Sequence, residues 1–342
     1  MSEIEQASRD RAASGSIRFN TDSSRLEIYN GEAWFEIDAT SPEQQTGGTR
    51  GILMEAGSEN VNTISFVNIS STGNAQDFGD CNVASGRKLT PSSRTRGIIA
   101  GGYPASNVID FITIDIKGNA QDFGDLNGST GARDAGASIS DRTRGVMAIT
   151  HTPSGVYNSI HFITIASTGN SLDFGDTSGS NGRTMGASSP TRGILFYGND
   201  GAPAYNMVNN IDFITISTTG NGADFGDKIQ GQSHGGSFSN AIRGVVGGGV
   251  ADNSGNITNV IQFVTIATLG NTVDFGDLTY NSRIMGSASS PTRGIFAGGL
   301  NPSVLNTISY VQIMTTGNAL DFGDLTSTSY GVSGLSNGHG GL

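Results

Sequence analysis

Short apolar runs alternate with clusters of Gly, Ser and Asn along most of the chain, and the apolar residues are largely β-branched or aromatic. This pattern is typical of many short β-strands joined by turns. In the segment NVIDFITIDI (107–116), apolar residues occupy both parities of the strand, as at Ile109 and Ile112. Such a strand is expected to be buried on both faces of its sheet.

A repeat organises residues 49–342. The string GNxxDFGD occurs six times at intervals of 45 to 51 residues, and each copy is preceded by an Arg-Gly pair that opens an apolar run. The first Asp of the string is Asp77, Asp122, Asp173, Asp224, Asp274 and Asp321. The Arg residues are Arg50, Arg96, Arg144, Arg192, Arg243 and Arg293.

Each unit contains four strand-like segments, which we name A, B, C and D. Around the second unit the B segment is TRGIIAGG (95–102), the C segment 107–116, the D segment AQDFGDL (120–126), and the next A segment ARDAGASIS (132–140). The A segments consist largely of small residues. We expect them to be the innermost strands, where bulky side chains would collide.

Four-stranded units of this length predict an all-β fold in which residues 49–342 form a six-bladed β-propeller. The first unit lacks an A segment, and the stretch after the last DFGD, STSYGVSGLSNG, resembles a surplus one. We therefore expect residues 330–335 to pair with residues 51–56, so that the C-terminal strand closes the first blade. A β-solenoid or an elongated trimeric prism is the alternative, and neither needs this pairing.

Residues 15–38 predict a separate small β-module, with a hairpin turn at Asn30-Gly31. Residues 39–48 have the composition of a linker, and residues 1–14 are either flexible or a short helix. So short a module cannot bury a core alone, and its apolar face is expected to be covered by other copies of itself, by the propeller or by another protein. That face is expected to contain Ile17, Phe19, Leu26, Ile28, Trp34 and Ile37.

The B, C and D segments resemble a kelch-type repeat, although Phe stands in DFGD where kelch repeats have Trp. The units are more similar to repeats of virion structural proteins of tailed, particularly marine, bacteriophages, on segments such as SSPTRGIFAGG and IDFITIxxTGNAxDFGDL. This resemblance covers nearly all of residues 49–342. The N-terminal pattern GxIRFNT, LExYNG and a following Trp is similar to a module common in phage tail-fibre proteins.

These resemblances imply a non-enzymatic virion structural protein on the tail or outer surface, made in the host cytoplasm. Its expected partners are other virion proteins, held through the N-terminal module, and further copies of itself. Tail-fibre or tail-associated adhesion to a host-surface polysaccharide is the first expectation. A capsid-surface decoration or fibre protein without a specific receptor is the second, and a propeller-type carbohydrate-active enzyme the third.

The loops between the B and C segments differ in length and composition, as recognition loops on a repeated scaffold do. Tyr residues in them offer an apolar ring face with a polar tip, which suits stacking on sugars. The alternative is that these loops are merely solvated. The candidate ligand-face residues are Tyr103, Tyr157, Tyr197 and Tyr205.

Charge and composition restrict the other partners. The net charge of −11 argues against nucleic-acid binding, which needs clustered Lys and Arg. No apolar stretch approaches the length of about 20 residues that spans a bilayer, so membrane insertion is not expected. The single cysteine, Cys81, cannot form an intramolecular disulfide.

The repeated DFGD string is interpreted as structural, with no catalytic residue, metal or cofactor assigned to the chain. A Ca²⁺ site at its Asp pair stays open as an alternative. We expect the Arg set to pair with the Asp set, against the alternative of independent solvated charges. His151, His161, His234 and His339 fall at different places in their units and form no catalytic pattern. The Phe residues expected to fill the spaces between blades are Phe78, Phe123, Phe174, Phe225, Phe275 and Phe322.

Overall fold

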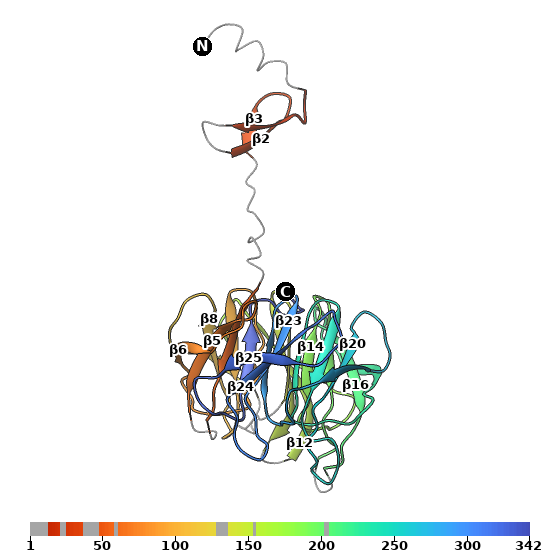
Figure 1. Ribbon diagram of the computed structural model, residues 1–342. Coiled ribbons are helices and arrows are strands. Elements are labelled where there is room, and N and C mark those ends of the chain that lie inside the picture. Colours follow the sequence, from red (N-terminus) through yellow and green to blue (C-terminus); the bar gives the residue numbers. More distant parts are fainter. Residues whose placement is uncertain are drawn as a thin grey trace. The chain divides into compact units, whose positions relative to one another are not determined.

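The computed structural model describes residues 13–20, 25–36, 48–57, 61–127, 136–152, 155–201 and 205–342. The chain divides into two compact units, Met1–Thr46 and Gly47–Leu342. The described residues form seven separate antiparallel sheets of three or four strands, so the fold is all-β (Figure 1). Within these residues, no helix has the length and apolar character needed to cross a membrane.

The first unit contains one three-stranded sheet in the order β1-β2-β3. The expected hairpin forms, and its loop has four residues because the register pairs Tyr29 with Trp34. Asn30 holds this loop, since its Oδ1 accepts hydrogen bonds from the backbone N–H groups of Glu32 and Ala33. The strands are β1 (Ile17–Asn20), β2 (Arg25–Tyr29) and β3 (Trp34–Glu36).

One face of this sheet is apolar and exposed. Cross-strand partners share a face, and the register places Ile28 opposite both Ile17 and Phe35. Ile17 is 60% exposed, so the sheet does not bury this face within its own unit. The face consists of Ile17, Phe19, Leu26, Ile28 and Phe35.

The expectation that Trp34 belongs to this apolar face is wrong. Trp34 lies opposite Tyr29, one position out of phase with Ile28, and therefore points to the other side of the sheet. There the guanidinium of Arg18 stacks 4.1 Å from the Trp34 ring centroid and also pairs with Glu27 at 2.8 Å. Ile37, the last expected member, lies outside the described residues.

The second unit contains six sheets, whose strands follow the A to D segments of the repeat. The A strands are β10 (Ala137–Ser140), β14 (Met185–Ser188), β18 (Gly236–Ser239), β22 (Gly286–Ser289) and β26 (Ser333–Ser336). The B strands are β4 (Arg50–Met54), β7 (Arg96–Ala100), β11 (Arg144–Thr152), β15 (Arg192–Phe196), β19 (Arg243–Gly247) and β23 (Arg293–Ala297). The C strands are β5 (Thr63–Asn68), β8 (Val108–Thr113), β12 (Gly155–Thr164), β16 (Asn210–Thr215), β20 (Val260–Thr265) and β24 (Thr307–Gln312). The D strands are β6 (Gln76–Asp80), β9 (Gln121–Asp125), β13 (Leu172–Asp176), β17 (Ala223–Asp227), β21 (Val273–Asp277) and β25 (Leu320–Asp324).

The C-terminal strand completes the first of these sheets. The sheet has the order β26-β4-β5-β6, and its register pairs Ser333 with Met54 and Ser336 with Gly51. The expected pairing of the C-terminal segment with the first Arg-Gly strand is therefore confirmed. The last strand of the chain thus covers the free edge of the first B strand.

The second sheet, β7-β8-β9, departs from the four-strand pattern. Its A segment is present only as two isolated bridges, from Leu89 to Ala100 and from Ser92 to Gly97. Pro91 lies between the two bridges and lacks the N–H group that a regular ladder requires. The segment still occupies its place between neighbouring A strands, because Thr90 Oγ1 donates to the carbonyl of Gly334 in β26.

Six apolar clusters lie between consecutive sheets, and each contains one Phe of a DFGD string. The C strands supply residues to the clusters on both of their faces: in β8, Ile109 and Ile112 belong to different clusters. The cluster around Phe322 joins the last sheet to Leu53 of the first. All six side chains are 2% exposed: Phe78, Phe123, Phe174, Phe225, Phe275 and Phe322.

The GN turn of each unit is hydrogen-bonded to the DFGD strand of the preceding unit. Between the fourth and fifth units, Gly270 N–H donates to the carbonyl of Phe225 at 2.8 Å, and Asn271 Oδ1 accepts from Asp227 N–H at 2.9 Å. A Cβ on Gly226 would lie 2.5 Å from the Gly270 oxygen, so only glycine permits this approach. The same bond joins Gly73 to Phe322, Gly118 to Phe78, Gly169 to Phe123, Gly220 to Phe174 and Gly317 to Phe275.

The expected ion pairs between the Arg and Asp sets do not form: none joins the two sets in the described part of the chain. Arg192 instead stacks 4.6 Å from the Phe213 ring centroid and donates from Nη1 to the carbonyl of Ile266 in the next sheet. Asp224 lies two strands away from Arg192, a lateral separation of about 10 Å. The other five bonds run from Arg50 to Ile114, Arg96 to Ile165, Arg144 to Ile216, Arg243 to Ile313 and Arg293 to Ile69.

The second unit has two different ends. The tail face carries the A–B turns, the C–D turns and residues 337–342, whereas the loop face carries the B–C and D–A loops. The chain enters on the tail face, because Arg50 N–H donates to Asn337 Oδ1 at 3.0 Å. Figure 1 shows the C-terminus at this end and the β11–β12 hairpin near the opposite end.

Candidate functional site

Two Tyr residues on the loop face are exposed and stack against arginines. The Tyr103 ring, 45% exposed, has the guanidinium carbon of Arg87 at 5.1 Å from its centroid. Tyr205, 40% exposed, has that of Arg183 at 5.5 Å. Cation–π contacts of this kind attract a guanidinium to the face of a ring and hold the two side chains together.

The other two candidate Tyr residues are placed differently. Tyr157 lies in β12 and is only partly exposed. Tyr197 is completely buried, which excludes it from a ligand surface, and its hydroxyl donates a short hydrogen bond to Asp212. Burial is the main reason that the pKa of Tyr197 is raised, and Asp212 adds to it.

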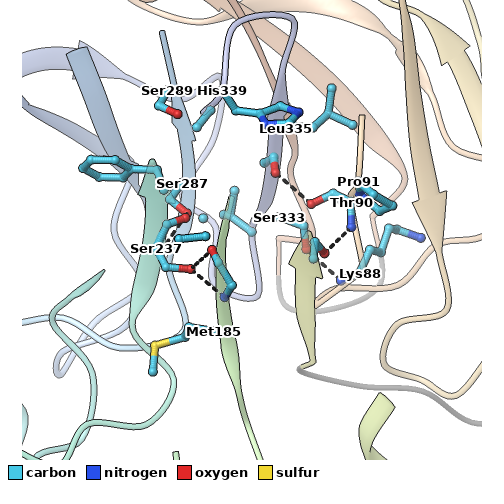
Figure 2. A pocket seen from close by; sticks show the side chains of 18 of the residues that line it. Lys88, Thr90, Pro91, Met185, Ser237, Ser287, Ser289, Ser333, Leu335 and His339 are labelled. Atoms are coloured by element: carbon cyan, nitrogen blue, oxygen red, sulfur yellow. Dashed lines mark hydrogen bonds between the residues drawn. The ribbon is translucent and has the colours of Figure 1, made fainter. Parts of the chain in front are cut away.

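A cavity of about 170 Å³ runs between the A strands, which are the innermost strands as expected (Figure 2). The A strands run from the loop face to the tail face. At the loop-face end the cavity is lined by Arg87, Arg183 and His234, which stand at the same repeat position of three units. His339 lines it at the tail-face end, and Met185 lies between the two ends. We call this space the axial cavity.

Serine side chains connect the A strands around the axial cavity. Each of six Ser hydroxyls forms a hydrogen bond with the backbone of the preceding A segment around the cavity, as in the bond from Ser289 Oγ to the carbonyl of Ser239 at 2.7 Å. The small Ser side chains allow neighbouring strands to approach, and their hydroxyls satisfy backbone groups that face another strand. The ring consists of Ser92, Ser140, Ser188, Ser239, Ser289 and Ser336.

The C-terminal residues cover the tail-face end of the cavity. His339 Nε2 donates to the carbonyl of Ser92 at 2.9 Å, while its Nδ1 accepts from Gly341 N–H at 3.1 Å. Both ring nitrogens are thus used by the neutral imidazole. Burial lowers the pKa of His339 to about 4, although Asp141 nearby acts in the opposite direction. The tail crosses the ends of several A strands, since Gly340 packs against the carbonyl of Ser188.

Several residues of basic type line the axial cavity, in a chain with a net charge of −11. They include Arg87, Lys88, Arg183, His234 and His339, and no Asp or Glu is among the described residues that line the cavity. The ammonium of one of these, Lys88, donates to the carbonyl of Val83 at 2.9 Å and to Ser85 Oγ at 2.6 Å. Burial lowers the pKa of Lys88.

A second, shallower groove lies on the loop face between the B–C loops of the fourth and fifth units. Its lining includes Met207, Ile229, Asp252 and Asn253. The two loops are linked because Met207 N–H donates to Asn253 Oδ1 at 2.8 Å. This link fixes the relative position of the two loops, and the groove combines amide groups with apolar side chains.

Among the described residues, no group of three or more His, Cys, Asp or Glu side chains is placed to hold a metal ion. His161 contacts Ser171 at 3.1 Å and His234 contacts Ser233 at 3.1 Å, in different repeats of the chain. The side chain of His151 lies outside the described residues. The first Asp of each DFGD string is exposed on an outer strand: Asp77, Asp122, Asp173, Asp224, Asp274 and Asp321.

The sequence contains a signal that places Arg87, Arg183 and His234 together, although it lies outside the Arg-Gly and DFGD motifs. Arg87, Arg183 and His234 each stand five residues before a serine of the ring. An alignment of the A segments on those serines therefore places the three residues at one repeat position. The sequence also indicates that Tyr197 does not lie in a loop tip. Tyr197 occupies the position in its repeat that Gly101 has in the second repeat, directly after the B strand.

No protein-family model matches the chain, and comparison with curated proteins finds no significant match.

Proposed function

We propose that this chain is a non-enzymatic structural protein of a tailed-bacteriophage particle, in which a six-bladed β-propeller presents its loop face to a host-surface glycan. The fold part of this proposal is supported by six successive sheets, by the hydrogen bond from Gly73 to Phe322 between the first and last units, and by the pairing of β26 with β4. These contacts form an unbroken cycle, as a propeller requires.

The observation that carries the adhesive role is the position of the chain entry. The chain enters the second unit on the tail face, where Arg50 and Asn337 meet, whereas the B–C loops lie at the opposite end. When the second unit is tethered through its N-terminal end, its loop face therefore stays available for binding. Exposed Tyr103 and Tyr205 on that face provide the aromatic surfaces that sugar rings favour.

The N-terminal sheet supports attachment to another component of the particle. Its apolar face includes Phe19, which is 60% exposed, and Phe35, which is 54% exposed. A sheet of three short strands gains little stability until such a face is covered. We assign this face to contacts with virion proteins or with other copies of the chain.

Two experiments on purified particles and cells test the proposal. Immunogold electron microscopy with an antibody against residues 49–342 is expected to label the tail. Uniform labelling of the head would favour the decoration role instead, and absence of label would contradict a virion location. Fluorescently labelled full-length protein is expected to bind host cells, and release of reducing ends from host polysaccharide would point to an enzyme.

A further inference from the structure

We propose that the groove on the loop face between the fourth and fifth units binds an uncharged saccharide, with Ile229 as the apolar contact for the sugar ring and Asp252 as an acceptor for its hydroxyl groups. This inference rests on the proposed function and deepens it, because it names a site and a class of glycan. The groove is open to solvent and has a volume of about 550 Å³, within the range of ~300–1,000 Å³ that is common for ligand sites.

Ile229 departs from the repeat at its position. At the second residue after the DFGD string, the other five units have polar residues: Asn82, Asn127, Ser178, Thr279 and Thr326. The backbone at this position makes the same kind of contact in different units. Ile229 N–H donates to Gln262 Oε1 at 3.0 Å, as the N–H of Ser178 donates to Asp212 Oδ2 at 3.0 Å. The apolar residue of the fourth unit therefore changes the surface while the contact with the neighbouring sheet is kept.

The side chain of Ile229 is exposed although its backbone is held firmly. It is 56% exposed, and its N–H also donates to Oγ1 of the buried Thr272 at 2.8 Å. The preceding residue, Lys228, points inward, where its ammonium donates to the carbonyls of Tyr197 and Gln232. An apolar side chain that is already held in place loses little backbone freedom when a ligand covers it, and its removal from water is favourable.

Polar groups from two loops line the groove together with Ile229. Asp252, Asn253 and Ser254 belong to the B–C loop of the fifth unit, and Asn209 belongs to that of the fourth. Asn209, Asn253 and Ser254 are exposed. A carboxylate accepts hydrogen bonds, whereas amide and hydroxyl groups both donate and accept. This combination matches a sugar, which has apolar C–H groups on the faces of its ring and hydroxyl groups around its edge.

Hydrogen bonds hold these polar groups in position. Asn253 Nδ2 donates to Asn206 Oδ1 at 2.9 Å, which joins the two loops. Asp252 Oδ1 accepts from the N–H groups of Ser254 and Asn256, and its Oδ2 accepts from Asn256 Nδ2 at 2.6 Å. Each carboxylate oxygen has two lone pairs, so Oδ2 can accept a sugar hydroxyl besides the amide of Asn256.

The charge of Asp252 favours an uncharged sugar over an acidic one. Hydrogen bonds from Asn256 hold the pKa of the Asp252 carboxyl below its ordinary value, so this group is ionised at neutral pH. A neutral hydroxyl donates to such a carboxylate in a charge-assisted hydrogen bond. A carboxylate or sulfate on the sugar would instead meet a like charge, in a chain whose net charge is −11.

Ligand-observed NMR titration of the full-length protein tests this site with maltotriose, cellotriose and mannotriose as neutral probes and with trigalacturonate as the charged one. The wild type is expected to bind at least one neutral probe, about tenfold more tightly than trigalacturonate. Ile229→Thr, which introduces the residue of the fifth and sixth units, is expected to weaken this binding about fivefold. Asp252→Asn is expected to weaken it about threefold. Binding of trigalacturonate as tight as that of the neutral probes, or no neutral binding at millimolar concentration, would overturn the proposal.

Ile242→Thr is the matched control. Ile242 is 51% exposed in an A–B turn on the tail face, where the other five units have Thr. Its replacement is expected to leave the affinity within about twofold of the wild type. Equal losses in Ile242→Thr and Ile229→Thr would trace the effect to surface apolarity in general and overturn the site. Should Ile229→Thr fail to fold in a thermal melt, folded Asp252→Asn decides, and unchanged affinity in that variant would overturn the site.

Attachment to host cells separates this site from the proposed function. Neutral-sugar binding that Ile229→Thr weakens, without attachment of the wild type to cells, would contradict adhesion and support the site. Equal attachment of the wild type and Ile229→Thr would support adhesion and overturn the site. Attachment that survives periodate oxidation of the cell-surface glycans, but not protease treatment of the cells, would indicate a protein partner and overturn the saccharide.

Discussion

Acidification is expected to destabilise the closed end of the axial cavity through His339. The neutral ring donates from Nε2 to the carbonyl of Ser92 and accepts at Nδ1 from Gly341 N–H. Protonation would place a second N–H against that of Gly341. The pKa is lowered from 6.5 to about 4, so between these values the unfolded chain binds a proton that the folded chain does not. Stability is therefore expected to fall as pH falls from 6.5 to 4.

A shift of this size corresponds to at most about 3 kcal/mol of folding free energy, and residual exposure of the ring reduces that figure. Urea unfolding of the wild type and of His339→Gln between pH 4 and pH 7 measures it, because the glutamine keeps an amide but cannot titrate. The difference between the two stabilities is expected to shrink or reverse towards pH 4. Parallel pH profiles for the two proteins would refute the assigned role of His339.

Three other changes probe the contacts between sheets and the packing of the interior. Gly226→Ala is expected to cost at least about 2 kcal/mol more than Gly220→Ala in urea unfolding: both glycines have positive φ, but only a Cβ on Gly226 meets a backbone oxygen within 4 Å. Similar losses for the two variants would contradict the close approach at the GN turn. Arg192→Gln is expected to lose about 1–2 kcal/mol, since it removes a stacked ring contact and a hydrogen bond to the next sheet, whereas the exposed Arg142→Gln should change little. Equal effects at these two positions would remove the inter-sheet role of the Arg set. Cys81 is 3% exposed, and burial raises its pKa to about 11. Ellman's reagent at pH 8 is therefore expected to react with Cys81 only after unfolding. Rapid reaction in native buffer would show that the sheet beside Cys81 is open.

The sequence predicts the order of the strands in the repeat because each strand type has its own local signal. The Arg-Gly pair opens every B strand, and the surplus small-residue segment at the C-terminus supplies β26, which pairs with β4 as expected. The predicted role of the Arg set fails for a reason of distance. Turn proximity alone places Arg192 near Asp224, but a C strand separates them, and an aromatic ring and a carbonyl of the next sheet are closer.

Side-chain direction is harder to predict than strand order. Trp34 is a large aromatic residue of the kind expected on the apolar face of the N-terminal module, but its pairing with Tyr29 places it on the opposite side of the sheet. Tyr197 follows directly after a B strand and turns inward to Asp212 instead of joining the loop surface. Both outcomes depend on register and on a partner distant in sequence, which local patterns do not specify.

Hydrogen exchange on the full-length protein tests most directly whether the C-terminal strand β26 closes the first sheet of the second unit by pairing with β4. Peptides covering β4 and β26 are expected to be protected to the same extent as peptides covering the interior pair β15 and β14, because the same ladder joins each pair. Exchange of β26 within seconds, while β14 stays protected, would contradict closure by the C-terminal strand.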